Sequence, residues 1–159
     1  MTARVSSLAD GTPLTRAAAA PSWRYALGGM LAAAAAAVSN LAWRNAYSGL
    51  TGYPLPDLID PTSVVLASVL AVLLAAGVYL LLSRGMAIAT PLYVLGCLTT
   101  AAVSCVATLT PVLPDGNPVP PGFPLLTIPM HLIAGLIAAV VVPLVTLVGV
   151  RRKLVGTAR

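Results

Sequence analysis

Apolar residues dominate the chain in four long, uninterrupted segments, and polar residues gather between them. These segments contain no Asp, Glu, Lys or Arg, and each holds between 19 and 28 residues: Tyr25–Trp43, Thr62–Leu82, Met86–Leu109 and Phe123–Val150. At about 1.5 Å of rise per residue, helices of this length reach or nearly reach the roughly 30 Å of hydrocarbon in a bilayer. The pattern predicts four membrane-spanning segments.

The four segments are typical of helices rather than strands. In hydrocarbon every backbone N–H and C=O has to be paired within the protein, which leaves α-helices or a closed barrel. Barrel strands alternate apolar and polar residues, whereas these segments are continuously apolar. The composition agrees, because 58% of the residues are hydrophobic and 8% are charged, against about 25% charged in a soluble domain. We expect an all-α, four-helix transmembrane bundle with antiparallel, up-down connections.

The charged residues predict the orientation of these spans. With four spans threaded alternately, eight of the nine basic residues fall on one side, and Arg44 falls on the other side with three of the four acids. The positive-inside rule then makes both termini cytoplasmic in a multi-pass protein of the cell (plasma or inner) membrane. Anionic lipid headgroups account for the net charge of +5, so we invoke no nucleic-acid partner. The eight basic residues are Arg4, Arg16, Arg24, Arg84, Arg151, Arg152, Lys153 and Arg159, and the three acids are Asp57, Asp60 and Asp115.

The chain divides into three parts. Residues 1–22 are polar and small without apolar periodicity, and predict a disordered cytoplasmic tail. Residues 23–150 form the four-span transmembrane domain, and residues 151–159 a basic cytoplasmic tail. A cleaved signal peptide is the alternative for the first span, because Ala32–Ala37 offers small residues to a peptidase. The long polar leader, and apolar residues that continue to Trp43, favour a retained span.

One polar residue in each span falls at a similar depth. Counting from the span ends puts Asn40, Ser68, Ser104 and His131 roughly 6–12 Å below the outer surface. Intramembrane polar groups often mark ligand or ion paths, so His131 would belong to an outward-facing polar pocket. Alternatively, neutral His131 bonds to Asn40 or Ser104 and fixes the register of the bundle.

Charged groups at the outer ends of the spans form a second candidate contact. We predict that Arg44 either extends into the lipid headgroups or forms an ion pair with Asp57 or Asp60. Asp60 is followed by Pro61, a combination that predicts a helix N-cap at the start of the second span.

Small residues recur at every fourth position in each span. Such faces let membrane helices approach closely, so we expect them to face the other helices of the bundle. The four sets are Gly28, Ala32, Ala36 and Asn40; Ser63, Ala67, Ala71 and Ala75; Gly96, Thr100, Ser104 and Thr108; and His131, Gly135 and Ala139.

The sequence predicts no catalytic residue, cofactor or metal ion. Cys97 and Cys105 are separated by about 12 Å along one helix, which is too far for a disulfide. A single histidine without acidic neighbours is not typical of a metal site.

Two known classes of membrane protein are also disfavoured. The absence of a carboxylate within the spans disfavours a proton-coupled exporter. An intramembrane serine protease would need an oxyanion-type motif beside Ser104 and His131, and the sequence has none. A non-enzymatic role is the simpler reading.

A family resemblance rests on Asn40-Leu41-Ala42, Gly52-Tyr53-Pro54-Leu55 and Met130-His131-Leu132. Over about residues 24–150, the chain resembles uncharacterised four-span integral membrane proteins, mainly actinobacterial, that are catalogued as a domain of unknown function. The resemblance implies a bundle with Asn40 and His131 as family positions, and it implies no activity or ligand. We expect a structural or accessory membrane bundle that contacts the lipid bilayer and a second copy or a membrane protein partner. The alternative is a small-molecule or lipid binding or transport module that uses the polar layer around His131.

Overall fold

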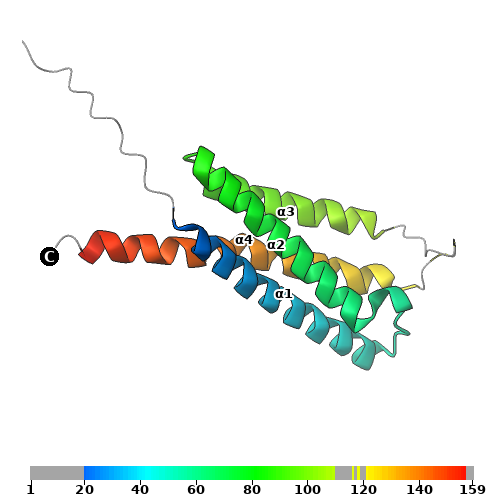
Figure 1. Cartoon of the computed structure of the whole chain (residues 1–159). Coiled ribbons are helices and arrows are strands. Elements are labelled where there is room, and N and C mark those ends of the chain that lie inside the picture. The colour runs from blue at the N-terminus through cyan, green and yellow to red at the C-terminus, as the bar shows by residue number, and fades with distance from the viewer. Residues whose placement is uncertain (1–19, 110–115, 117, 119–120, 157–159) are drawn as a thin grey trace, which may run out of the picture.

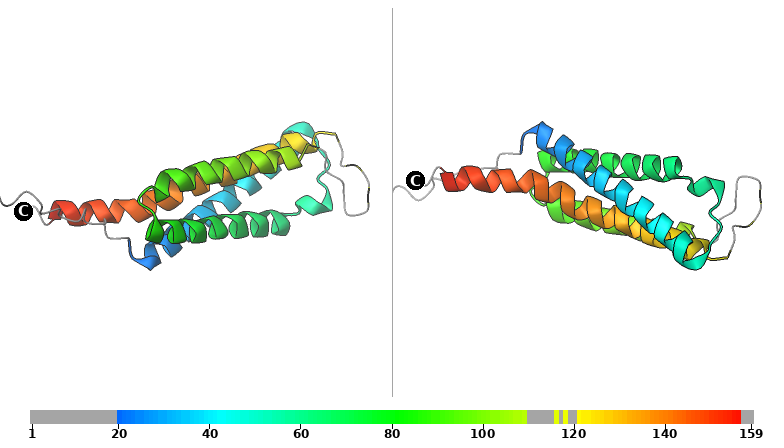
Figure 2. Two further views of the ribbon diagram at one scale, coloured as in Figure 1. Left: turned by 90° about the horizontal axis from the view of Figure 1, so that it is seen from above. Right: turned by 90° about the horizontal axis from the view of Figure 1, so that it is seen from below.

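The structure is a computed structural model that describes residues 20–109, 116, 118 and 121–156. Within these residues it contains four α-helices, one 3-10 turn and no β-strand. The elements are α1 (Ser22–Thr51), η1 (Asp57–Ile59), α2 (Pro61–Gly85), α3 (Ala89–Ala107) and α4 (Phe123–Gly156). The helices form an elongated bundle, and α4 reaches past the others at its C-terminal end (Figures 1 and 2). The predicted all-helical, four-helix fold is confirmed.

The helix limits differ from the charge-free segments at several ends. α1 continues to Thr51 because the first strong stop signal is Gly52, whose φ of 68° is left-handed and whose N–H donates to the Ser48 carbonyl at 2.9 Å. α3 is shorter than its segment at both ends. α4 continues to Gly156, into the residues predicted as the basic tail. Residues 1–19 and 157–159, where most of the predicted cytoplasmic tails lie, are outside the described residues.

Asp60 caps the N-terminus of α2, as its position before Pro61 predicts. Its carboxylate accepts a hydrogen bond from the Thr62 N–H at 2.8 Å, and further bonds from the N–H and the hydroxyl of Ser63. These bonds pair backbone donors that a helix start otherwise leaves open. The Ser63 hydroxyl, together with the two N–H groups, holds the pKa of Asp60 below its ordinary value of 3.8.

The four helices pack unequally. α1 contacts both α2 and α4 extensively, and α3 packs mainly on α4. By contrast, α2 and α3 contact each other little, although only residues 86–88 separate them in the sequence. Below, the end of the bundle near these residues is called the turn end, and the end near η1 is called the η1 end. The unequal packing leaves space between α2 and α3.

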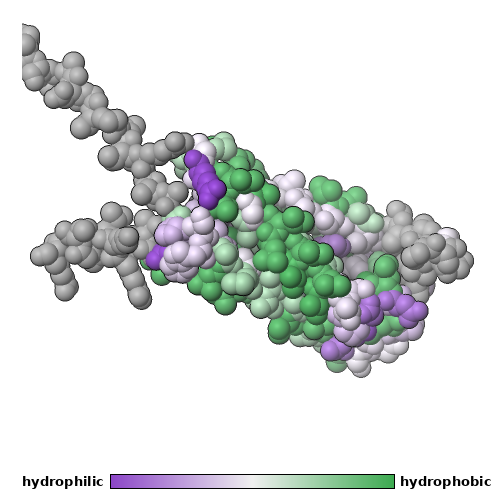
Figure 3. Space-filling view, viewed as in Figure 1, coloured by the Kyte–Doolittle hydropathy of each residue, from purple (hydrophilic) through white to green (hydrophobic). Residues whose placement is uncertain are grey.

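The bundle buries many alanines and leaves most of its leucines exposed. Ala32 and Ala36 are completely buried, whereas Leu74 is 72% exposed and Leu81 is 68% exposed. Apolar surface covers the middle of the face in Figure 3, and polar surface gathers chiefly at the two ends. Since a soluble protein buries its leucines in preference to its alanines, this inverted arrangement indicates a lipid surround, in which small residues at helix interfaces allow close packing.

Two glycines mark where helices approach most closely. A Cβ atom built on Gly135 of α4 would lie 2.6 Å from the Cβ of Ala101 on α3, and one built on Gly29 of α1 would lie 2.8 Å from the Cβ of Ala76 on α2. Carbon atoms prefer separations of about 3.5–4.0 Å. Only glycine therefore permits these two contacts at their present spacing.

The structure corrects part of the predicted helix faces. In the first predicted set all four residues, from Gly28 to Asn40, are buried as expected. In the second set Ser63, Ala67 and Ala71 are exposed, and in the third Gly96 and Thr100 are exposed. The buried line of α2 is instead one residue further along, and includes Val64, Ser68, Val72 and Ala76. The shift arises because alanines are so frequent that they do not identify one unique packing face.

Candidate functional site

The predicted polar layer is divided into two parts, and the first is a buried pair between α1 and α2. Asn40 donates from Nδ2 to the Ser68 hydroxyl at 2.9 Å, and the two residues are only 3% and 4% exposed. The Asn40 Oδ1 atom is also buried and accepts no hydrogen bond from the described residues. This pair joins two helices, although the interhelical bond predicted from the sequence is one between His131 and Asn40 or Ser104.

The second part of the layer, Ser104 on α3 and His131 on α4, lines a pocket of about 590 Å³ between α2 and α3. We call this pocket the lateral groove. Ala71, Ala75 and Val78 form its α2 wall, Gly96, Thr100 and Ser104 its α3 wall, and His131, Ala134 and Gly135 its α4 floor. Asn40 and Ser68 are not among its lining residues. The groove thus unites two of the four predicted polar residues and excludes the other two.

Burial distinguishes the mouth of the lateral groove from its floor. Gly96, Thr100 and Ala71 are exposed and form the mouth, whereas Val72 and Ala101 are buried beneath it. The exposed wall residues belong to the surface that the bilayer would cover. The groove therefore opens sideways between α2 and α3, which contact each other little, onto the surface that a bilayer would cover.

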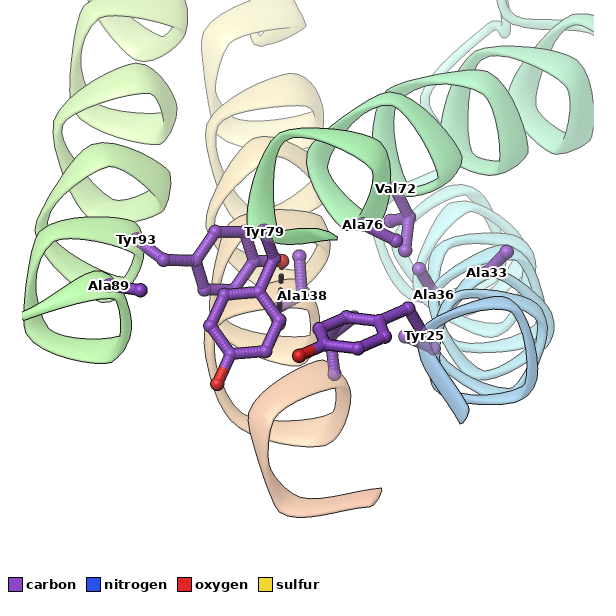
Figure 4. Close-up of a cluster of buried hydrophobic side chains, with 11 residues drawn as sticks. Tyr25, Ala33, Ala36, Val72, Ala76, Tyr79, Ala89, Tyr93 and Ala138 are labelled. Carbon is purple, nitrogen blue, oxygen red and sulfur yellow. Dashed lines mark hydrogen bonds between the residues drawn. The ribbon is translucent and has the colours of Figure 1, made fainter. Parts of the chain in front are cut away.

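Three tyrosines close the bundle at the turn end. The Tyr79 and Tyr93 rings lie 4.6 Å apart between centroids, and the Tyr25 ring lies 5.5 Å from Tyr79 (Figure 4). The Tyr93 hydroxyl donates to the Ala138 carbonyl at 3.1 Å, and the Tyr79 and Thr90 hydroxyls are 2.9 Å apart. Since Tyr79 and Tyr93 have protein partners for their hydroxyls, this end of the groove presents mainly apolar surface.

Three other polar side chains of the lateral groove have no such partners. Within the part of the chain that the structure describes, Thr100, Ser104 and His131 form no side-chain hydrogen bond. A hydroxyl donates and accepts, and a neutral imidazole does both at its two nitrogens. This cluster can therefore bind an uncharged oxygen-bearing group. The bond from His131 to Asn40 or Ser104 that we considered from the sequence is not present.

Arg44 forms hydrogen bonds with protein groups other than the two aspartates that were one of its two predicted alternatives. Its Nε donates to the Ile59 carbonyl at 2.6 Å and its Nη1 to the Asn45 side chain at 2.9 Å. No ion pair with Asp57 or Asp60 forms among the described residues, and the Asp60 carboxylate instead caps the start of α2. Arg44 therefore anchors η1 to the end of α1 through the backbone.

Aromatic residues at the η1 end form hydrogen bonds between helices that the sequence does not indicate. The Trp43 indole donates to the Leu126 carbonyl at 2.9 Å, and the Tyr47 hydroxyl donates to the Gly122 carbonyl at 3.0 Å. Burial raises the pKa of the neighbouring Tyr53. These contacts join α1 to the start of α4, whereas position in the sequence alone predicts only rings at the membrane surface.

The lining of the lateral groove and the tyrosine cluster are the features that sequence reasoning missed. A usable signal for the cluster was present, because Tyr79 and Tyr93 lie within continuously apolar segments, where a hydroxyl requires a partner. No comparable signal identified Ala75 or Gly96 as groove residues.

In the part of the chain that the structure describes, the fold is all-helical, with four helices long and apolar enough to cross a membrane. Comparisons with models of known protein families, with curated proteins and with solved structures found no match. Any function therefore has to be argued from the geometry of the bundle itself.

Proposed function

We propose that the protein is a multi-pass integral membrane protein whose four helices cross the cell membrane in an antiparallel, up-down order with both termini in the cytoplasm. The single observation that carries this proposal is the inverted distribution of side chains, with alanines in the core and exposed leucines on the helices. In water such a surface would favour aggregation, whereas in lipid it has no cost.

The contacts between helix ends support the up-down order. Arg84, at the end of α2, donates to the Ser22 hydroxyl at the start of α1 at 3.0 Å, so Arg24 and Arg84 belong to the same end of the bundle. Arg44 and Ile59, next to Asp60, meet at the opposite end. An end with arginines and an end with aspartates agree with the positive-inside rule, and the arginine end would be cytoplasmic.

Topology can be tested with single cysteines in a chain whose Cys97 and Cys105 are replaced by alanine. A membrane-impermeant maleimide is expected to label a cysteine at Leu58 in η1 from outside intact cells, and a cysteine at Arg159 only after permeabilisation. Recovery of the protein in the membrane pellet after alkaline carbonate washing is the matched control. Labelling of Arg159→Cys in intact cells, or release of the protein into the supernatant, would contradict the proposal.

Within that class, we propose an accessory, non-catalytic role in which the bundle binds lipid, a second copy or a membrane protein partner. The resemblance to actinobacterial four-span proteins of unknown function belongs to the same proposal and adds no activity. In this role the Asn40–Ser68 pair fixes helix register. Replacing His131 with Gln would then change stability and no other measured property.

A second candidate function is favoured by the lateral groove. A pocket of about 590 Å³ lies within the range of about 300–1,000 Å³ that is typical of sites for small ligands. It is mostly apolar and contains a few unpartnered polar groups, including Ser104 and His131, which is the usual composition of such sites. On this reading the protein is a lipid or small-molecule binding module.

A further inference from the structure

We propose that the lateral groove binds a single-chain amphiphile, with its hydrocarbon chain between α2 and α3 and an uncharged oxygen-bearing head at Ser104 and His131. The proposal rests on the second candidate function and specifies its ligand. It commits to a lipid-like molecule that enters sideways from the bilayer, and it concerns the described residues of α2, α3 and α4.

The first argument is the polarity of the groove along its length. The lining residues nearest the turn end include Leu82, Leu92 and Tyr93, and the hydroxyl of Tyr93 is bonded to Ala138. The lining residues nearest the η1 end include Ser104 and His131, whose side chains have no hydrogen-bond partner among the described residues. A molecule with an apolar tail and a hydrogen-bonding head matches this gradient in one orientation only.

The second argument is length. Leu92 and Ser104 are twelve positions apart on α3, which corresponds to about 18 Å along the helix. Half of the roughly 30 Å hydrocarbon core is about 15 Å. The groove is therefore somewhat longer than the depth of one leaflet and runs along most of α3, and a chain that lies in it would have its head at the η1 end.

The third argument is size. The volume of about 590 Å³ lies within the range of about 300–1,000 Å³ that is typical of sites for small ligands. A single-chain amphiphile belongs to that size class.

The fourth argument concerns the head. The groove is lined by no Asp, Glu, Lys or Arg, and an isolated charge in a low-dielectric site is strongly disfavoured. Ser104, Thr100 and His131 together offer both donors and acceptors. An alcohol satisfies them without a charge, so a long-chain alcohol is the simplest probe.

The test uses the full-length protein in phosphatidylcholine vesicles with two trace probes, a diazirine-bearing long-chain alcohol and the matching diazirine-bearing alkane. Photolabelling is mapped to residues by mass spectrometry. For the wild-type protein we expect labels on α2 and α3 wall residues and stronger labelling by the alcohol than by the alkane. One hydrogen bond at the head corresponds to a preference of roughly 2- to 10-fold.

Three variants separate the chain site from the head site. Gly96→Leu fills the groove, and because a Cβ atom at Gly96 meets nothing within 4 Å, the helix accommodates the change. We expect it to abolish labelling of the walls by both probes. Gly77→Leu is the matched control, since Gly77 is equally open but does not line the groove, and it should label like the wild type. His131→Phe keeps a ring and should remove only the preference for the alcohol.

Several results would overturn the proposal. Equal labelling of wild type and Gly96→Leu would show that the probes contact the outer surface alone. Equal labelling of the wild type by alcohol and alkane would remove the head site. A chemical cross-link between two copies across the groove, in place of wall labelling, would assign it to a second copy. Recovery of each variant in the membrane pellet after alkaline carbonate washing tests separately whether the protein is an integral membrane protein.

Discussion

The close contact between α3 and α4 at Gly135 gives a sharp quantitative prediction. Gly135→Ala adds one methyl group whose carbon would start 2.6 Å from the Cβ of Ala101 and 3.4 Å from the Cys97 carbonyl oxygen. Carbon atoms prefer about 3.5–4.0 Å, so α3 and α4 have to separate by about 1 Å. Forcing an extra methyl group into a packed interface costs about 1–3 kcal/mol. Removing glycine from a helix returns about 0.5–1 kcal/mol, so the net destabilisation is between about 0 and 2.5 kcal/mol.

Gly77→Ala on α2 is the matched control, because a Cβ atom there meets nothing within 4 Å. It shares the gain in helix propensity without the clash, so the two variants should differ by the clash alone, about 1–3 kcal/mol. The measurement is the free energy of unfolding in mixed detergent micelles, followed by circular dichroism. Adding Ala101→Gly to Gly135→Ala moves the methyl group to the other helix and should restore much of the stability. A difference between the alanine variants below about 0.5 kcal/mol would refute the close contact.

Two further predictions concern the polar contacts of the bundle. In a double-mutant cycle of Asn40→Ala and Ser68→Ala, we expect a coupling energy of about 0.6 kcal/mol and at most about 1.7 kcal/mol, measured by the same unfolding assay; additive effects would show that the 2.9 Å bond contributes nothing. Because the folded state lowers the pKa of Asp60 from 3.8, its stabilising effect is complete above that value and is lost as the pH falls through the lower folded-state value. The melting temperature of the wild type should therefore exceed that of Asp60→Asn by a margin that shrinks below about pH 4, and a constant margin would contradict the role of the carboxylate.

The helices could be predicted from the sequence because the signal for each is simple and strong. A continuously apolar, charge-free segment long enough to cross a bilayer satisfies its backbone hydrogen bonds as a helix, because it lacks the alternation of a barrel strand. The N-cap at Asp60 is equally local, since a carboxylate before Pro61 is adjacent to the donors that it pairs. By contrast, the extension of α1 to Thr51 depends on polar residues that are compatible with either helix or loop.

The division of the polar layer could not be predicted, since it depends on helix rotation. Equal depth places Asn40, Ser68, Ser104 and His131 at similar heights but does not say which way each side chain points. On α2 the packing face includes Ser68 and Val72, whereas Ala71 and Ala75 point to the groove. In soluble helices the apolar face identifies the core. In these helices all faces are largely apolar, so hydrophobicity does not identify the face that packs against the other helices.

The position of the glycines explains why a groove exists between two helices that follow each other in the sequence. Gly29 allows α1 to pack closely against α2, and Gly135 allows α4 to pack closely against α3. A larger residue at either position would not fit at the present spacing. The tyrosines hold α2 and α3 together at the turn end, where Tyr79 and Tyr93 stack. Among the described residues, no hydrogen bond joins α2 to α3 further from this end. The lateral groove is thus a consequence of two close contacts elsewhere, and loosening the α3–α4 contact with Gly135→Ala should alter wall labelling as well as stability.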